Sequence, residues 1–125
     1  MERKRFIVEL GTGIDLHGED VTEAAVRAVK DAVSKSCLCG LMEILEIKDI
    51  NQIEVDVLVA APKPDEVDVG KVKEAVPIGG NDVTVVEGGM TTDGLCVDMF
   101  APDCDKIVVV NVSLTVFIKP VFINQ

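Results

Sequence analysis

The stretch GTGIDLHGED, residues 11–20, contains the side chains of this chain best suited to metal or acid–base chemistry. His17 is the only histidine in the sequence, and Asp15 precedes it by two residues. Imidazole and carboxylate groups bind zinc and related divalent ions, and in an extended segment side chains at this spacing point to the same side. Because a closed zinc site needs three or four protein ligands, the pair predicts either a shared ion with a further ligand or a metal-free pocket in which Asp15 orients His17.

Glycines surround this pair at a predicted connection from a strand to a helix. Such a connection brings backbone amides and the positive field of a helix N-terminus to one place. Gly11, Thr12, Gly13 and Gly18 are therefore candidate ligand-binding residues, although glycines also serve simply to permit a tight turn. The segment is not a dinucleotide fingerprint, because Leu16 occupies the position of the third glycine in GxGxxG.

A second segment with polar side chains is EGGMTTDG, residues 87–94. Thr91 and Thr92 supply hydroxyl groups for ligand binding, and Asp93 supplies a carboxylate that could act as a base. We therefore add Asp93 to the catalytic candidates of the first segment, with the two segments meeting across a subunit interface. The alternative is a glycine-rich hairpin loop, because Asp-Gly between strands is a common turn signal.

The four cysteines, Cys37, Cys39, Cys96 and Cys104, fit reduced thiols better than disulfides. A pair separated by one residue is a poor disulfide, and no CxxC repeat of a zinc ribbon is present. A thiolate close to His17 would supply a nucleophile or a third metal ligand. Reduced thiols are typical of a reducing compartment, and we expect a cytoplasmic protein.

The size and charge of the chain exclude several classes of function. The chain has 125 residues, of which 48% are hydrophobic, and we expect residues 1–125 to form a single domain. The net charge of −10 at pH 7 disfavours nucleic acid and anionic membranes as partners. The longest apolar run, IVVVNVSLTVFI, is far shorter than the roughly 20 residues that a membrane-spanning helix needs.

Hydrophobic periodicity predicts six elements in the order β-α-β-α-β-β. They are strands at 5–10, 52–62, 81–89 and 105–119 and helices at 20–36 and 68–76; residues 37–51 suit either a short helix or a strand. The first helix has one apolar stripe, formed by Val21, Ala25, Ala28, Val29, Ala32 and Val33. Asp20 and Glu23 have the spacing of a capping box at its start.

The last strand indicates an oligomer as well as a core. Its even positions from Val108 to Ile118 are all apolar, while Asn111, Ser113 and Thr115 interrupt the odd positions. At about 3.3 Å per residue the strand would be roughly 40 Å long, which is more than a small monomeric sheet usually needs. One face should be core, and we expect the other to contact another subunit.

This order of elements predicts an α+β sandwich with helices on one face of the sheet. By fold the chain resembles the chorismate-mutase-like proteins, whose members often close three sheets into a trimer. The resemblance implies a homo-oligomer, with a trimer favoured.

Two motif resemblances bear on function. GTGIDLHG together with AAVRAVKDA resembles a small family of uncharacterised conserved hypothetical proteins with the pattern GxGxDxHG after the first strand. The GxDxH part is similar to the metal-binding start of methylerythritol cyclodiphosphate synthase, a trimeric enzyme, and this implies that Asp15 and His17 are two metal ligands. That family takes its third ligand from a second histidine, which this sequence lacks, so the cyclase activity is not transferred.

The sequence thus leads to two hypotheses from different classes. The first is an enzyme that uses zinc or manganese to act on a small polar or phosphorylated metabolite at subunit interfaces. The ion would polarise a carbonyl or phosphoryl oxygen. The alternative is a non-catalytic protein that binds a small ligand or takes part in assembly.

Overall fold

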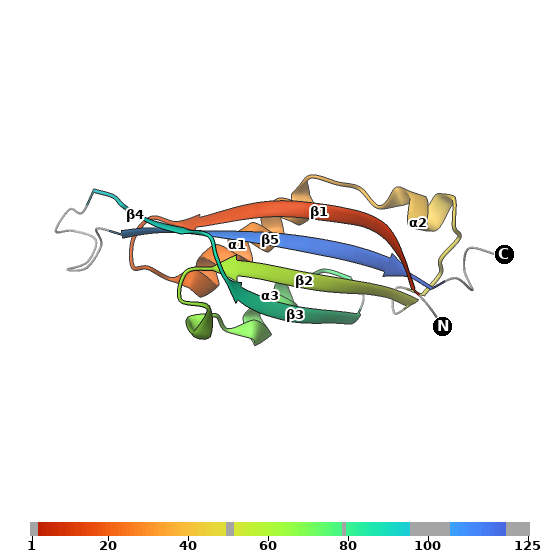
Figure 1. The fold of residues 1–125 in the computed structure, drawn as a ribbon. Helices are drawn as coiled ribbons and strands as arrows, with labels where there is room; N and C mark the ends of the chain where they lie inside the picture. The colour runs from red at the N-terminus through yellow and green to blue at the C-terminus, as the bar shows by residue number, and fades with distance from the viewer. Residues whose placement is uncertain (1–2, 50–51, 79, 96–105, 120–125) are drawn as a thin grey trace.

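The computed structural model describes residues 3–49, 52–78, 80–95 and 106–119, which form one mixed sheet with helices on one side (Figure 1). The elements are β1 (Lys4–Asp15), α1 (Val21–Ser34), α2 (Cys39–Glu43), β2 (Ile53–Ala61), the 3₁₀ turn η2 (Pro64–Glu66), α3 (Val69–Ala75), β3 (Gly80–Glu87), β4 (Met90–Asp93) and β5 (Lys106–Ile118). The strand order is β1-β5-β2-β3, and β4 pairs with β5 beyond the end of β2. β2 and β3 run parallel, whereas the other pairs are antiparallel. The predicted α+β class with helices on one face is confirmed.

The predicted order of elements is incomplete, because two expected loops contain strand. β1 continues through residues 11–15, expected to be a glycine loop, and pairs with β5 as far as Asp15 opposite Val108. The expected hairpin loop at 87–94 contains β4, which pairs with β5 and not with β3. Gly89 makes this path possible: its φ is +65°, and a Cβ there would lie 2.1 Å from the carbonyl oxygen of Val109. The unassigned segment contributes the short helix α2.

α1 lies directly against the backbone of β1. A Cβ at Gly13 would lie 1.8 Å from the carbonyl oxygen of Ala24, and one at Gly11 would lie 2.1 Å from that of Ala28. Both alanines are fully buried. Both of these strand positions are therefore glycine, because no larger residue fits beneath the helix.

Of the predicted features of α1, the apolar stripe and the Asp20 cap are confirmed, whereas the Glu23 carboxylate pairs with Arg27 and does not complete a capping box. The stripe is buried and gains one member: Val21, Ala24, Ala25, Ala28, Val29 and Ala32 are buried, and Val33 is partly buried. Asp20 is the N-cap, and its carboxylate accepts a hydrogen bond from the Glu23 amide at 3.0 Å. Neither α1 nor another helix in the described ranges is long and apolar enough to span a bilayer.

Alternate side chains of each strand form two rows, and the strands differ in whether the more apolar row faces the helices. In β2 and β5 the apolar alternate residues are buried, as the sequence predicts. In β1 a register shift lies between Arg5 and Ile7, and beyond it the row that faces the helices contains Glu9 and the glycines. Val8 and Leu10 belong to the opposite, exposed row, where Leu10 is 64% exposed. The helix-free side of the sheet is therefore partly apolar.

The close approach of α1 to β1 predicts a large penalty for Gly13→Ala. The added methyl must displace the helix, which should lower the free energy of unfolding by about 3 kcal/mol in urea denaturation. The matched control is Gly40→Ala in α2, where the nearest atoms to an added Cβ are 3.6 Å away. Gly40→Ala should raise the free energy of unfolding, by no more than about 1 kcal/mol, because alanine favours a helix more than glycine does. Equal losses in both variants would contradict the packing described here.

Candidate functional site

Asp15 connects the end of β1 to the start of α1. Its side chain is buried, and one carboxylate oxygen accepts a hydrogen bond from the amide of Asp20 at 2.9 Å. The other lies 3.4 Å from the guanidinium of Arg27. The Asp20 amide would otherwise be available to Glu23 in a capping box, so Asp15 takes the place of that partner. The carboxylate thus holds the strand-to-helix connection closed.

The connection itself is a tight turn. Gly18 has a φ of +96°, and Glu19, which follows it, has a φ of +52°. The carboxylate of Glu19 pairs with Lys63 beside η2 at 3.1 Å, and this hydrogen bond raises the pKa of Lys63. Gly18 therefore serves the turn, because its backbone conformation is one that side chains disfavour.

His17 lies beside Asp15 at the surface. The two side chains line an open pocket of about 440 Å³, together with Ile14, Leu16 and Arg27. His17 is half-buried. Within the described ranges, no three side chains of the types His, Cys, Asp or Glu gather closely enough to hold a metal ion. The Asp15–His17 metal site accordingly stays a prediction.

The second predicted segment lies at the same end of the sheet as the first, within one chain. Asp15 and Thr91 are both paired with Val108, on opposite sides of β5. Thr92 and Asp93 follow along β4, and all three β4 side chains are exposed. Asp93 bonds to Lys106, and this hydrogen bond lowers the pKa of the Asp93 carboxyl. Thr91 therefore shares a row of the sheet with Asp15, but no β4 residue lines the His17 pocket.

Two charged side chains of α1 and that of its C-cap residue, Lys35, bond to the outer backbone edge of β1. Arg27 donates to the carbonyl oxygen of Ile14 at 2.6 Å, and Lys35 donates to that of Leu10 at 3.5 Å. Between them, the carboxylate of Asp31 accepts the amide of Thr12 at 2.9 Å. These side chains hydrogen-bond to the backbone groups that a further strand would use. We call Arg27, Asp31 and Lys35 the edge ladder.

Thr12 is engaged on both sides of its backbone. Its backbone amide donates a hydrogen bond to Asp31, and its hydroxyl donates one to the side-chain amide oxygen of Asn111 at 3.1 Å on the open side of the sheet. Gly11 and Gly13 lie under α1. The predicted ligand-binding residues of the first segment thus have structural contacts, and none of Gly11, Thr12 and Gly13 lines the His17 pocket.

Of the cysteines, two lie in the described residues. Cys37 and Cys39 are free, as expected for a pair separated by one residue, and both are exposed. Cys96 and Cys104 lie outside the described residues. Arg27 is the residue of this region that the sequence did not single out. In the sequence, Arg27 is marked only by its position two helical turns after the Asp20 cap, and its contacts with Ile14 and Asp15 are seen only in the structure.

The chain is thus a small α+β protein. It has a mixed sheet with helices on one face, and the GxGxDxHG segment lies at the first strand-to-helix connection. The chain belongs to a family of conserved hypothetical proteins (Lin0512_fam), whose model matches residues 5–116, and the predicted membership of an uncharacterised conserved family is confirmed. The GxGxDxHG pattern as a mark of that family stays a prediction. Its structure is similar to a crystal structure of an FtsZ-like protein of unknown function from Nostoc punctiforme PCC 73102. The two are 35% identical with a TM-score of 0.86, over 95% of this chain and 98% of the other. No curated protein matches the chain. The likeness to methylerythritol cyclodiphosphate synthase stays a prediction.

The edge ladder predicts a specific loss of stability in acid. The hydrogen bond from the Thr12 amide, then that from Lys35, lowers the pKa of Asp31 below its ordinary value of 3.8. A lowered folded-state pKa stabilises the protein above the unfolded value, and this contribution disappears as the pH falls through the folded value. The free energy of unfolding should therefore fall more steeply in the wild type than in Asp31→Asn between about pH 5 and about pH 2.

The control for this measurement is Glu43→Gln, which removes an exposed carboxylate of α2. Its pH profile should run parallel to that of the wild type. Parallel profiles for Asp31→Asn as well would mean that Asp31 does not hold the edge of β1.

Proposed function

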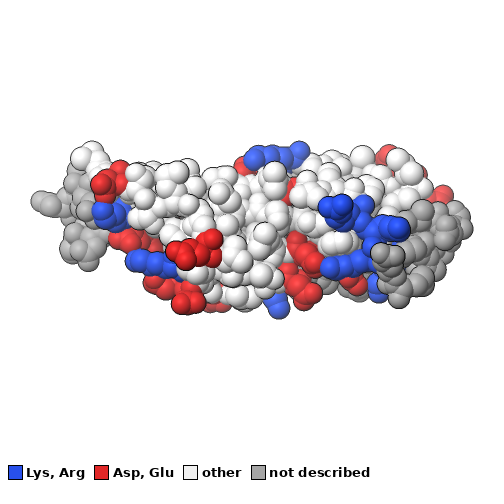
Figure 2. All heavy atoms as spheres, in the orientation of Figure 1, with Lys and Arg blue, Asp and Glu red and all other residues white. Residues whose placement is uncertain are grey.

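We propose that this chain is a non-catalytic assembly protein that self-associates through the helix-free side of its sheet. The proposal rests on one observation: this side carries exposed apolar residues and an uncharged centre. The central residues, which we call the open face, are Leu10, Thr12 and Ile14 of β1, Val109, Asn111 and Ser113 of β5, Leu58 and Ala60 of β2, Thr84 and Val86 of β3, and Met90 of β4. Figure 2, which views this side, shows a broad region without charged side chains.

The open face exceeds what scattered surface hydrophobics would give. Leu10, Ile14, Leu58, Val86 and Met90 are all exposed. Contiguous exposed apolar surface on a small protein is typical of an interaction site. The four long strands have 8 to 13 residues each. With a rise of about 3.3 Å per residue and a distance of about 4.8 Å between strands, this side of the sheet covers roughly 500 Å² per copy, or roughly 1,000 Å² in a pair. That total is near the lower limit for a specific interface.

Charges at one end of the sheet support a second copy as the occupant. Arg5 is exposed on β1, at one edge, and Asp82 is exposed on β3, at the other. A two-fold axis parallel to the strands would place β1 of one copy over β3 of the other, with the basic edge against the acidic edge. The face is therefore complementary to itself in charge.

The edge ladder also favours stacking over strand addition. It occupies outward backbone groups of β1 that a strand from another copy would need. Strand addition at the β1 edge is thus disfavoured, which supports the open face as the contact surface.

Light scattering after size-exclusion chromatography tests this proposal. The wild type should have twice the monomer mass of 13.4 kDa, and Leu58→Lys should convert it to monomer, because a buried unpaired charge costs several kcal/mol. The matched control is Ile44→Lys at the C-cap of α2, since Ile44 is 79% exposed and is not one of the open-face residues. A monomeric wild type would overturn self-association, and a trimer would overturn the two-fold arrangement.

A second candidate function, metal-assisted chemistry on a small polar or phosphorylated metabolite, draws on the shared pocket of Asp15 and His17. If an ion binds there, these two side chains would hold it, and Arg27 would contribute positive charge toward an anionic substrate. Asp93 and Thr92 are too far along β4 to line this pocket in the same chain, so their participation requires a neighbouring copy.

Elemental analysis of the protein purified without a histidine tag tests the metal proposal. Near-stoichiometric zinc or manganese should be present in the wild type and in Leu16→Ala, which alters the pocket wall without removing a ligand atom. The metal should be absent from His17→Ala. If His17→Ala instead lowers the melting temperature or changes the oligomer mass without displacing any ion, the residue serves the turn and the metal proposal fails.

A further inference from the structure

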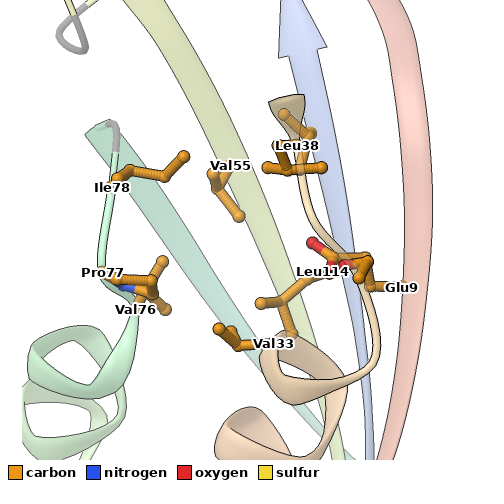
Figure 3. A pocket seen from close by; sticks show the side chains of 10 residues that line it. Glu9, Val33, Leu38, Val55, Val76, Pro77, Ile78 and Leu114 are labelled. Atoms are coloured by element: carbon orange, nitrogen blue, oxygen red, sulfur yellow. Dashed lines mark hydrogen bonds between the residues drawn. The ribbon is translucent and has the colours of Figure 1, made fainter. Parts of the chain in front are cut away.

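A small cavity lies on the helix side of the sheet, away from both the open face and the His17 pocket. It has a volume of about 50 Å³. Figure 3 shows its walls: Val33 and Leu38 on one side, Val76, Pro77 and Ile78 on the other, and Val55 and Leu114 on the sheet behind. Such a cavity is large enough for a few water molecules or one small chemical group.

The cavity has an acidic group in an otherwise apolar lining. Glu9, on the helix-facing row of β1, is only 9% exposed and lines the cavity with Ser36. The Ser36 hydroxyl donates a hydrogen bond to the Glu9 carboxylate. No lysine, arginine or histidine lines the cavity, and within the described ranges no ion pair reaches Glu9. A carboxylate buried with a single hydroxyl partner is under-compensated.

The backbone adds negative potential at the same place. Val33 belongs to the last turn of α1, and Ser36 follows the end of that helix. The C-terminus of a helix carries a partial negative charge and favours cations. Val76 and Pro77 follow the end of α3 on the opposite wall. The cavity thus combines a carboxylate with the negative end of α1.

We propose that this cavity binds a primary alkylammonium group, with Glu9 as its counter-ion. An ammonium group donates three hydrogen bonds, which suits the free lone pairs of a carboxylate and the oxygen of Ser36. Metal ions fit less well, because magnesium and calcium take six or more oxygen ligands. The apolar walls suit a short aliphatic chain. The ligand class is therefore a small primary amine or the end of an extended amine such as a lysine side chain.

This site is independent of the proposed assembly, because it lies on the other side of the sheet. Substitutions on the open face, such as Leu58→Lys, should leave it unchanged. Failure of either proposal therefore leaves the other standing.

The test is an NMR titration of the wild type with n-propylammonium chloride, with n-propanol as a neutral ligand of the same chain length and sodium chloride as the salt control. The ammonium should cause saturable shifts at Val33, Leu38, Val76 and Ile78, with a dissociation constant on the order of 1 mM for so small a ligand. The alcohol should bind roughly tenfold more weakly, because it lacks the charge-assisted hydrogen bond. Equal shifts from alcohol and ammonium, or no saturable shifts, would overturn the proposal.

Two variants test whether propylammonium binding depends on the Glu9 carboxylate. Glu9→Gln keeps the shape and removes the charge, and it should weaken propylammonium binding roughly tenfold or more. Glu74→Gln removes an exposed carboxylate of α3 that does not line the cavity, and its titration should match that of the wild type. Unchanged binding in Glu9→Gln contradicts the assignment. If Glu9→Gln does not fold, the contrast between ammonium and alcohol in the wild type still decides the question.

Discussion

The contact between the backbone of α1 and two glycines of β1 is the constraint on which the rest of the structure depends. Gly11 and Gly13 leave room for the carbonyl groups of α1 to approach the strand, and the small residues Ala24, Ala28 and Ala32 complete the contact. Any larger side chain in either row would lift the helix from the sheet. The GxG portion of the motif is thus explained by packing, without reference to a ligand.

This close approach also determines what the charged residues of α1 can reach. Because the helix lies low over the first strand, Arg27, Asp31 and Lys35 extend to the backbone of β1 and satisfy its outer edge. Asp15 completes the connection by accepting the Asp20 amide. An edge strand that would otherwise invite pairing is thereby protected by the helix that packs on it.

The two sides of the sheet consequently have different roles. The helix side is closed along most of its length and leaves a cavity where α1 and α3 end, with Glu9 in its wall. The other side has no covering element in the described ranges and is uncharged at its centre. The proposed binding of a small cation on one side and the proposed association through the other would use separate surfaces, so one need not interfere with the other.

Local sequence signals determined the first helix and the two central strands of this protein, and only the tertiary structure decided the remaining strand segments and the surfaces that the elements create. The alternation in Ile53–Ala61 and in Lys106–Ile118, the apolar stripe of α1 and the Asp20 cap depend on neighbouring residues, so periodicity and capping chemistry predict them. The strand character of Gly11 and Gly13, the path of Gly89 across the sheet and the burial of Glu9 depend on elements far away in the chain. No local pattern contains those contacts, because a glycine in a loop and a glycine beneath a helix look alike in sequence.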